Sequence, residues 1–108
     1  MNSQKKTKQK VAEMLQKHPD YVPCLIINKA PKQIQLQKHK YLVPKDLSMA
    51  MFIMVIRKSA KISPEQAIFL LVENKIPVPT ETMEQLYDKY KSKNDYLYIN
   101  LTVENTFG

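Results

Sequence analysis

The distribution of glycine sets the strongest limit on how this chain can fold. Its 108 residues include a single glycine, Gly108, which is the last residue. Average usage would give about seven or eight glycines, and proteins place many of them where the backbone must turn with a positive φ. Turns inside this chain therefore have to be built from other residues, chiefly Asn, Asp and Pro, and a glycine-rich phosphate-binding loop is excluded.

Length and composition indicate one globular domain. A chain of 108 residues has room for one hydrophobic core, and its 44% hydrophobic and 25% charged residues are the balance of a folded protein. No apolar run approaches the ~20 residues that cross a bilayer, and no secretory signal is apparent. The one cysteine, Cys24, cannot form an internal disulfide, and a Cys/His metal site has too few ligands. We expect no metal, no cofactor and a reducing compartment, the cytosol or the nucleus.

Positive charge is concentrated in two stretches. The chain carries a formal charge of +7; residues 1–17 hold five lysines against one acid, Glu13, and residues 29–45 hold five lysines and no acid. Such asymmetry favours an acidic partner, which could be nucleic acid, anionic lipid or an acidic peptide. For any single lysine, a solvated surface position is the commoner role.

The first half of the chain predicts a helix, two strands and a second helix. Residues 5–17 form a basic helix with a small apolar stripe. Residues 22–28 are mostly apolar and β-branched and predict a strand, and residues 40–44 predict a shorter one. The strongest helix spans residues 47–58, with Ser48 as its N-cap and its methionines filling the core.

The second half predicts further strands and one more helix. A short helical turn is expected at residues 63–66, and the apolar run 67–72 suits a strand in the centre of a sheet, covered on both faces. A helix over residues 83–91 follows, and residues 96–101 alternate as a last strand. The helix opens with a capping box made by Thr82 and Gln85.

This order of elements predicts an α+β fold, a ubiquitin-like β-grasp with an N-terminal helical extension. The strands form a mixed sheet, and the main helix packs across one of its faces. We divide the chain into a basic N-terminal helical segment, residues 1–20, and a ubiquitin-like domain with a C-terminal tail, residues 21–108.

We find no arrangement of residues that would make this chain an enzyme. Cys24 with His18 or His39 could be a nucleophile and a base, but Cys24 lies within an apolar strand, where an inert thiol is expected. Glu81 and Glu84 stand at a helix start and complement its dipole.

Nucleic-acid binding is the second hypothesis from the residues alone. Lys38, His39, Lys40 and Tyr41 mix basic and aromatic side chains in a way that suits a phosphate backbone. Arginine, which reads base edges best, occurs only once, at Arg57, so the attraction would be unspecific.

Several motifs together resemble the autophagy-related ubiquitin-like modifiers, the family of the GABA-receptor-associated protein and microtubule-associated light chain 3. The resemblance runs from about Met14 to the C-terminus, and residues 40–58 with the aromatic-Gly end are its specific parts. The matching residues are Lys40-Tyr41-Leu42-Val43-Pro44, Asp46-Leu47, Phe52, Ile56-Arg57-Lys58, Ala67-Ile68-Phe69, Met83, Leu86-Tyr87, Leu97-Tyr98 and Phe107-Gly108.

The resemblance implies conjugation through Gly108. In this family the terminal glycine carboxylate is adenylated by an activating enzyme, passed through thioesters on partner cysteines, and joined to the amine of phosphatidylethanolamine. A processing and deconjugating cysteine protease acts at the same glycine. The protein would be cytoplasmic, and on the autophagosomal membrane when lipidated.

The resemblance also implies a peptide-binding face along residues 40–44, where receptors with an aromatic-x-x-aliphatic motif would add a strand. Pro44, which has no N–H, independently indicates an exposed edge there. The motif's aromatic residue would enter a pocket of Met14, Pro23, Lys40, Leu42 and Tyr96. Its aliphatic residue would enter a pocket of Tyr41, Val43, Pro44, Leu47, Phe52 and Val55. Arg57 and the lysines would attract acidic residues that flank the motif.

Three positions depart from the family pattern. Tyr21 and Ser59 stand where a basic residue is usual, and Tyr96 stands where Phe is usual. The changes at Tyr21 and Ser59 bear on the expected contacts with acidic residues that flank the motif. Two alternatives are kept beside the modifier: a basic nucleic-acid-binding domain, and an adaptor of the same fold that is never conjugated.

Overall fold

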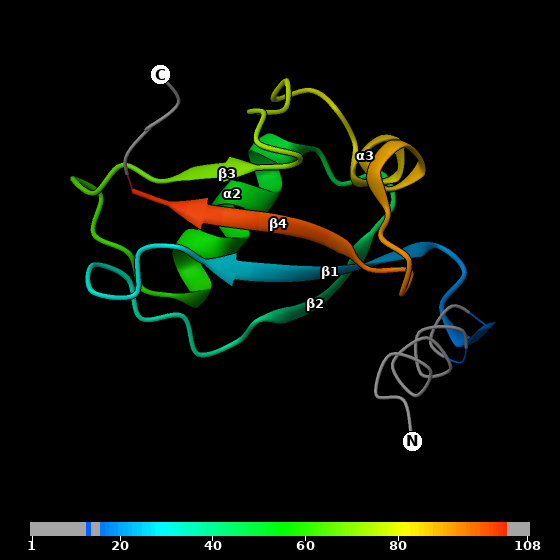
Figure 1. The fold of residues 1–108 in the computed structure, drawn as a ribbon, viewed down its shortest axis with the longest axis horizontal. Coiled ribbons are helices and arrows are strands. Elements are labelled where there is room, and N and C mark those ends of the chain that lie inside the picture. Colours follow the sequence, from blue (N-terminus) through cyan, green and yellow to red (C-terminus); the bar gives the residue numbers. More distant parts are fainter. Residues whose placement is uncertain (1–12, 14–15, 104–108) are drawn as a thin grey trace.

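A mixed β-sheet with helices packed against it makes up the part of the chain that the computed structural model describes, namely Glu13 and residues 16–103 (Figure 1). The predicted helix over residues 5–17 lies mostly outside this part, although Glu13, Gln16 and Lys17 are helical. The separate segment 1–20 accordingly stays a prediction. The elements are β1 (Tyr21–Asn28), β2 (Lys40–Pro44), α2 (Met49–Ser59), β3 (Phe69–Leu71), α3 (Met83–Tyr90) and β4 (Leu97–Thr102).

The sheet has the strand order β2-β1-β4-β3. Its central pair is parallel, with Cys24 beside Leu97 and Asn28 beside Leu101. The outer strands run antiparallel to their neighbours, β2 along β1 and β3 along β4. Helix α2 lies across one face of this sheet (Figure 1), so the predicted α+β arrangement is confirmed.

The prediction that residues 67–72 form a central strand is wrong. The strand β3 has three residues and lies at the edge of the sheet. The run is apolar because it is buried in other ways: Ile68, Leu70 and Val72 belong to the core cluster, and Leu71 is buried beside them. A continuous apolar run reports burial, and burial at an edge strand can come from connections as well as from neighbouring strands.

Alternate residues of the strands form the core with α2. Along β1, Val22, Cys24 and Ile26 are at most 2% exposed and belong to the same core cluster as Phe52 and Ile56 of α2. The intervening residues of β1 point to the other face of the sheet, which we call the outer face.

The prediction that the methionines of α2 fill the core is correct for one of three. Met49 is 2% exposed, whereas Met51 and Met54 are 55% and 59% exposed. Met51, Met54 and the exposed Val55 stand three and four residues apart and so share one side of the helix. The sequence of α2 shows apolar residues on most sides of the helix, and one of these sides is exposed in the structure.

Both predicted helix caps are confirmed. The Ser48 hydroxyl accepts a hydrogen bond from the Met51 N–H at 3.2 Å and starts α2. Thr82 and Gln85 form the reciprocal capping box that starts α3, with distances of 3.2 and 3.0 Å. These bonds satisfy N–H groups that a helix start leaves without an intrahelical partner.

Tight turns are made without glycine. Positive φ angles of 53°, 53°, 62° and 67° are adopted by Lys61, Glu73, Asn74 and Asp95. Glu73 and Asn74 join Val72 to Lys75, whose backbones exchange hydrogen bonds of 2.9 and 3.0 Å, the pattern of a two-residue hairpin. Lys61 follows the C-cap of α2, Ala60, and lets the N–H of Ile62 donate back to the Arg57 carbonyl at 3.0 Å.

Candidate functional site

The strand β2 offers an open edge. In the sheet formed by the described residues, β2 is an outer strand and pairs only with β1. Because the Ile26 N–H donates to the His39 carbonyl at 2.8 Å, the backbones of Tyr41 and Val43 also face β1. The backbone groups of Lys40 and Leu42 then face away from the sheet and are free to pair with an added strand.

The two prolines of this region occupy positions where the sheet needs no N–H. Pro44 is the last residue of β2, and its nitrogen faces the open edge. Pro23 pairs with Leu42, and its nitrogen faces β4 one residue before the parallel ladder begins at Cys24. Proline is accepted at such places because no ladder hydrogen bond is lost.

The described residues that were predicted to form a pocket for an aromatic side chain lie close together on the outer face. Pro23 and Leu42 are cross-strand neighbours, Lys40 pairs with Leu25, and Tyr96 directly precedes the residue that lies beside Cys24. Leu42 is half-buried and Lys40 is exposed, whereas Tyr96 is 4% exposed and the Pro23 side chain is also buried. Burial, followed by the charge of Tyr98, raises the pKa of Tyr96. Met14 lies outside the described residues.

The residues predicted to form a pocket for an aliphatic side chain come from β2, α2 and the connection between them, and they divide into two groups by burial. Tyr41, Val43 and Phe52 are 6%, 5% and 0% exposed and belong to the core. Pro44, Leu47 and Val55 remain partly or fully accessible. An entering side chain would meet the second group first, and the core residues would form the floor.

Tyr41 links the strand to the helix beneath it. Its ring meets the Phe52 ring edge-on, with centroids 5.8 Å apart, and its hydroxyl donates to the Ser59 Oγ at 3.1 Å. The Lys38 ammonium lies 4.7 Å from the centre of the same ring. Ser59, at one of the departures from the family pattern, therefore has a structural partner in Tyr41.

The predicted acid-attracting residues lie around this edge, but Arg57 is partly engaged. Its guanidinium donates to the Ser63 carbonyl at 3.4 Å, a long contact that leaves other donors available. Lys45, after β2, lies 3.6 Å from the Glu84 carboxylate. Lys38 and Lys40 are exposed.

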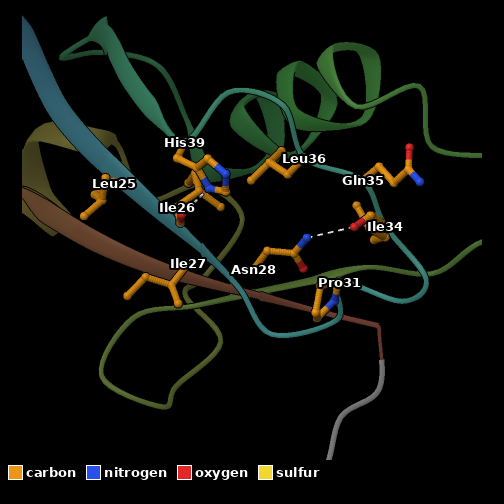
Figure 2. Close-up of a pocket in the computed structure, with 9 residues that line it drawn as sticks. All are labelled: Leu25, Ile26, Ile27, Asn28, Pro31, Ile34, Gln35, Leu36 and His39. Carbon is orange, nitrogen blue, oxygen red and sulfur yellow. Dashed lines mark hydrogen bonds between the residues drawn. The ribbon is translucent and has the colours of Figure 1, made fainter.

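A hollow of about 600 Å³ begins at Leu25, the cross-strand neighbour of Lys40, and the sequence did not predict it (Figure 2). The end of β1 forms one wall with Leu25 and Ile27, and the connection to β2 forms the other with Ile34 and Leu36. Asn28 fixes that connection by donating from Nδ2 to the Ile34 carbonyl at 2.8 Å. The sequence of β1 held a signal for this hollow. Its apolar run has no polar alternation, which predicts apolar residues on both faces of the sheet.

The one cysteine has no nucleophilic character. Cys24 is 0% exposed in the central strand, and burial raises its pKa to about 12. The thiolate, which is the reactive form, is therefore scarce at neutral pH. This agrees with the expectation of an inert thiol.

Searches for a metal site and a membrane span were negative within the described residues. No three His, Cys, Asp or Glu side chains among them are placed to hold a metal ion. None of the helices there has the length and apolar character needed to cross a bilayer.

Comparison with known proteins gives one consistent result. The family described as "Autophagy protein Atg8 ubiquitin like" matches residues 6–108. Autophagy-related protein 8e of Arabidopsis thaliana is 41% identical over 109 residues, covering 99% of this chain and 88% of that protein.

Solved structures agree with the fold. The crystal structure of Trypanosoma brucei ATG8 matches with a TM-score of 0.87 and 29% identity, covering 99% of this chain and 93% of that one. Plasmodium falciparum Atg8, solved with a Plasmodium falciparum Atg3 peptide, matches with a TM-score of 0.86 and 23% identity, covering 95% and 92%. These matches confirm the predicted ubiquitin-like fold.

Proposed function

The chain belongs to the Atg8 family of ubiquitin-like autophagy proteins, and from that premise we propose that it is a modifier conjugated through Gly108 to phosphatidylethanolamine. The observation that carries the proposal is the family match itself, which runs through the tail and includes Gly108. In this proposal the chain is the substrate of conjugating enzymes and is not itself an enzyme.

The chemistry of Gly108 suits that role. With no Cβ, its carboxylate can enter a narrow active site that would exclude a larger residue. The last strand ends at Thr102 and Val103 is the last described residue, so five residues carry the chain to Gly108. Five extended residues span at most about 18 Å, which is enough to reach beyond the domain surface.

We propose activating-like and conjugating-like enzymes and a processing cysteine protease as partners. The Plasmodium relative was solved with an Atg3 peptide, and this supports a conjugating enzyme of the Atg3 kind as a partner here. The chain would be cytoplasmic before conjugation and on autophagosomal membranes after it.

The test is mass spectrometry of the C-terminal peptide from cells in which autophagy is induced. We expect a fraction of the peptide to carry the mass of phosphatidylethanolamine in amide linkage to Gly108. Phospholipase D cleaves phosphatidic acid from the ethanolamine of this lipid. Treatment with it should therefore leave ethanolamine in amide linkage to the glycine. A C-terminal peptide that is always a free carboxylate would refute conjugation and leave the adaptor alternative.

We further propose that the open edge of β2 binds receptors with aromatic-x-x-aliphatic motifs. The outward backbone groups of Lys40 and Leu42 would pair with the peptide, and the accessible residues on either side would take its two anchors. The lysines would raise the association rate for peptides with acidic flanks.

Leu42→Ala is expected to weaken binding of such a peptide by roughly 1–3 kcal/mol, the range of a buried interface anchor. Leu42 suits this test because it is half-buried and outside the core cluster, so the fold should survive. Val78→Ala is the control, since Val78 is 56% exposed before α3 and far along the chain from β2. Titration calorimetry measures both, and equal affinities for Leu42→Ala and wild type would place the peptide elsewhere.

A further inference from the structure

Two basic connections meet where the last strand ends. Leu101, near the end of β4, accepts a hydrogen bond from the Lys29 N–H at 2.7 Å, and Thr102 pairs with Phe69 at the start of β3. The segments that lead to and from these points are residues 29–39, which connect β1 to β2, and residues 57–68, which comprise the end of α2 and its connection to β3. Figure 1 shows both at the end of the sheet where β4 finishes.

The two segments also line a common hollow. A hollow of about 490 Å³ is lined from one side by residues 33–37 and from the other by residues 59–66. Together they carry six basic residues and one acid, Glu65. We call this surface the basic end; its residues are Lys29, Lys32, Lys38, Arg57, Lys58 and Lys61.

At the opposite end of the sheet, the residues that the structure describes show no such excess. There Lys45 lies 3.6 Å from Glu84, and Lys89 lies 3.2 Å from Glu81. Asp20 and Asp46 line a shared hollow with the first of these pairs. Among the described residues, positive charge is therefore gathered at one end of the sheet and balanced at the other.

We propose that the basic end binds anionic phospholipid headgroups without a covalent bond and seats the domain end-on upon the membrane. This inference rests on the proposed conjugation, because a lipid on Gly108 lies at most about 18 Å beyond Val103. The tether alone brings this end of the sheet to the bilayer surface. The field of an anionic membrane falls off within a Debye length of about 8–10 Å, so the groups at the tethered end are the ones best placed to feel it.

The residue types fit a lipid surface better than a sequence-specific nucleic acid site. Five of the six groups are lysines, which act as hydrated point charges on flexible stems and need no fixed geometry in the partner. Each lysine close to an anionic membrane raises binding by roughly fivefold. Three of them together should account for about 100-fold, and the binding should weaken as salt is added.

The experiment compares two variants of the full, unconjugated chain that lose the same charge. The basic-end variant is Lys29→Gln, Lys32→Gln and Lys61→Gly, where glycine keeps the positive φ of 53° at residue 61. The control is Lys75→Gln, Lys91→Gln and Lys93→Gln, at exposed positions away from the basic end. Co-sedimentation measures binding to phosphatidylcholine vesicles with and without phosphatidylserine, at low and physiological salt.

We expect the basic-end variant to lose about 100-fold in affinity for the phosphatidylserine vesicles and the control to lose less than about threefold. Equal losses in the two variants, or binding that does not depend on phosphatidylserine, would overturn the proposal. Retained vesicle binding with lost binding to an RNA oligonucleotide would overturn it in favour of nucleic acid.

Orientation is measured on chains coupled to vesicle lipid through Gly108→Cys, which needs no conjugating enzyme. A second cysteine, at Gln33 or at Asp88, is labelled with a fluorophore before coupling while the terminal one is protected; Cys24 is 0% exposed and will not react. A quencher on the headgroups should quench the label at residue 33 more strongly than that at residue 88. The reverse order would overturn the proposal. Because neither assay uses the enzymes, failure of conjugation in cells is a separate result.

Discussion

Gly108→Ala is expected to lower the yield of thioester and phosphatidylethanolamine adducts by at least about 100-fold in a reconstituted conjugation reaction. The added methyl group stands on the residue whose carbonyl carbon must be attacked. A displacement of about 1 Å at a reacting centre can cost about 100-fold in rate. The described part of the domain ends five residues before Gly108, at Val103, so the substitution should not change the stability of the domain.

Asn105→Ala is the matched control for that variant, because it changes the same tail without adding a Cβ. Its adduct yield should stay within about threefold of wild type, and thermal unfolding should be the same for all three chains. Wild-type yield from Gly108→Ala would mean that the terminal residue does not enter a confined active site. The modifier proposal would then lose its chemical basis.

Phe52→Ala is expected to lower the free energy of unfolding by about 3–5 kcal/mol, as measured by urea denaturation. Phe52 is 0% exposed in α2, and its ring packs edge-on against Tyr41. Removing the ring deletes its burial and leaves a cavity between the helix and the sheet. Small domains are stable by about 5–15 kcal/mol, so this single substitution should remove a large part of the total stability.

Val55→Ala is the control on the same helix. Val55 is 38% exposed, so its loss should change stability by less than about 0.5 kcal/mol. A cost below about 1 kcal/mol for Phe52→Ala would show that Phe52 lines an open pocket instead of the core. With the expected result, weak peptide binding by Phe52 or Tyr41 variants could not be assigned to lost contacts, and Leu42, Leu47 and Val55 become the informative positions.

Local features of the fold were predictable because their causes are local. Ser48 and the pair Thr82 and Gln85 cap the helices that follow them through bonds spanning three residues. The bounds of β2 matched the predicted residues 40–44, since proline and the change in polarity mark them.

Features that depend on distant parts of the chain were not predictable. The apolar run ending in Leu71 and Val72 looked like a central strand, because hydrophobicity does not distinguish cover by strands from cover by connections. Met51 and Met54 looked buried beside Met49, because methionine is apolar wherever it stands. The parallel pairing of β1 with β4 joins residues that are about 70 positions apart, and no local signal specifies it.

The candidate site shows the same division. The resemblance selected residues that lie near the edge strand β2. Leu42 of β2 pairs with Pro23, and Leu47 follows β2 by three residues. Packing decides which of these side chains are accessible to a peptide. Tyr96 and Phe52 are buried, whereas Leu42 and Val55 are at least partly exposed. Their role in peptide binding remains a prediction, as do those of Met14 and Gly108, which lie outside the described residues.

The parallel pairing of β1 and β4 has a mechanical consequence. The chain enters this pair at Tyr21 and leaves it at Thr102, at opposite ends of two adjacent strands. Tension between the N-terminal segment and a tethered tail would pull the strands past each other in shear, loading the hydrogen bonds of the ladder together and not one after another as in peeling. A protein held by its tail on a moving membrane would thus resist being unravelled along the direction in which it is pulled.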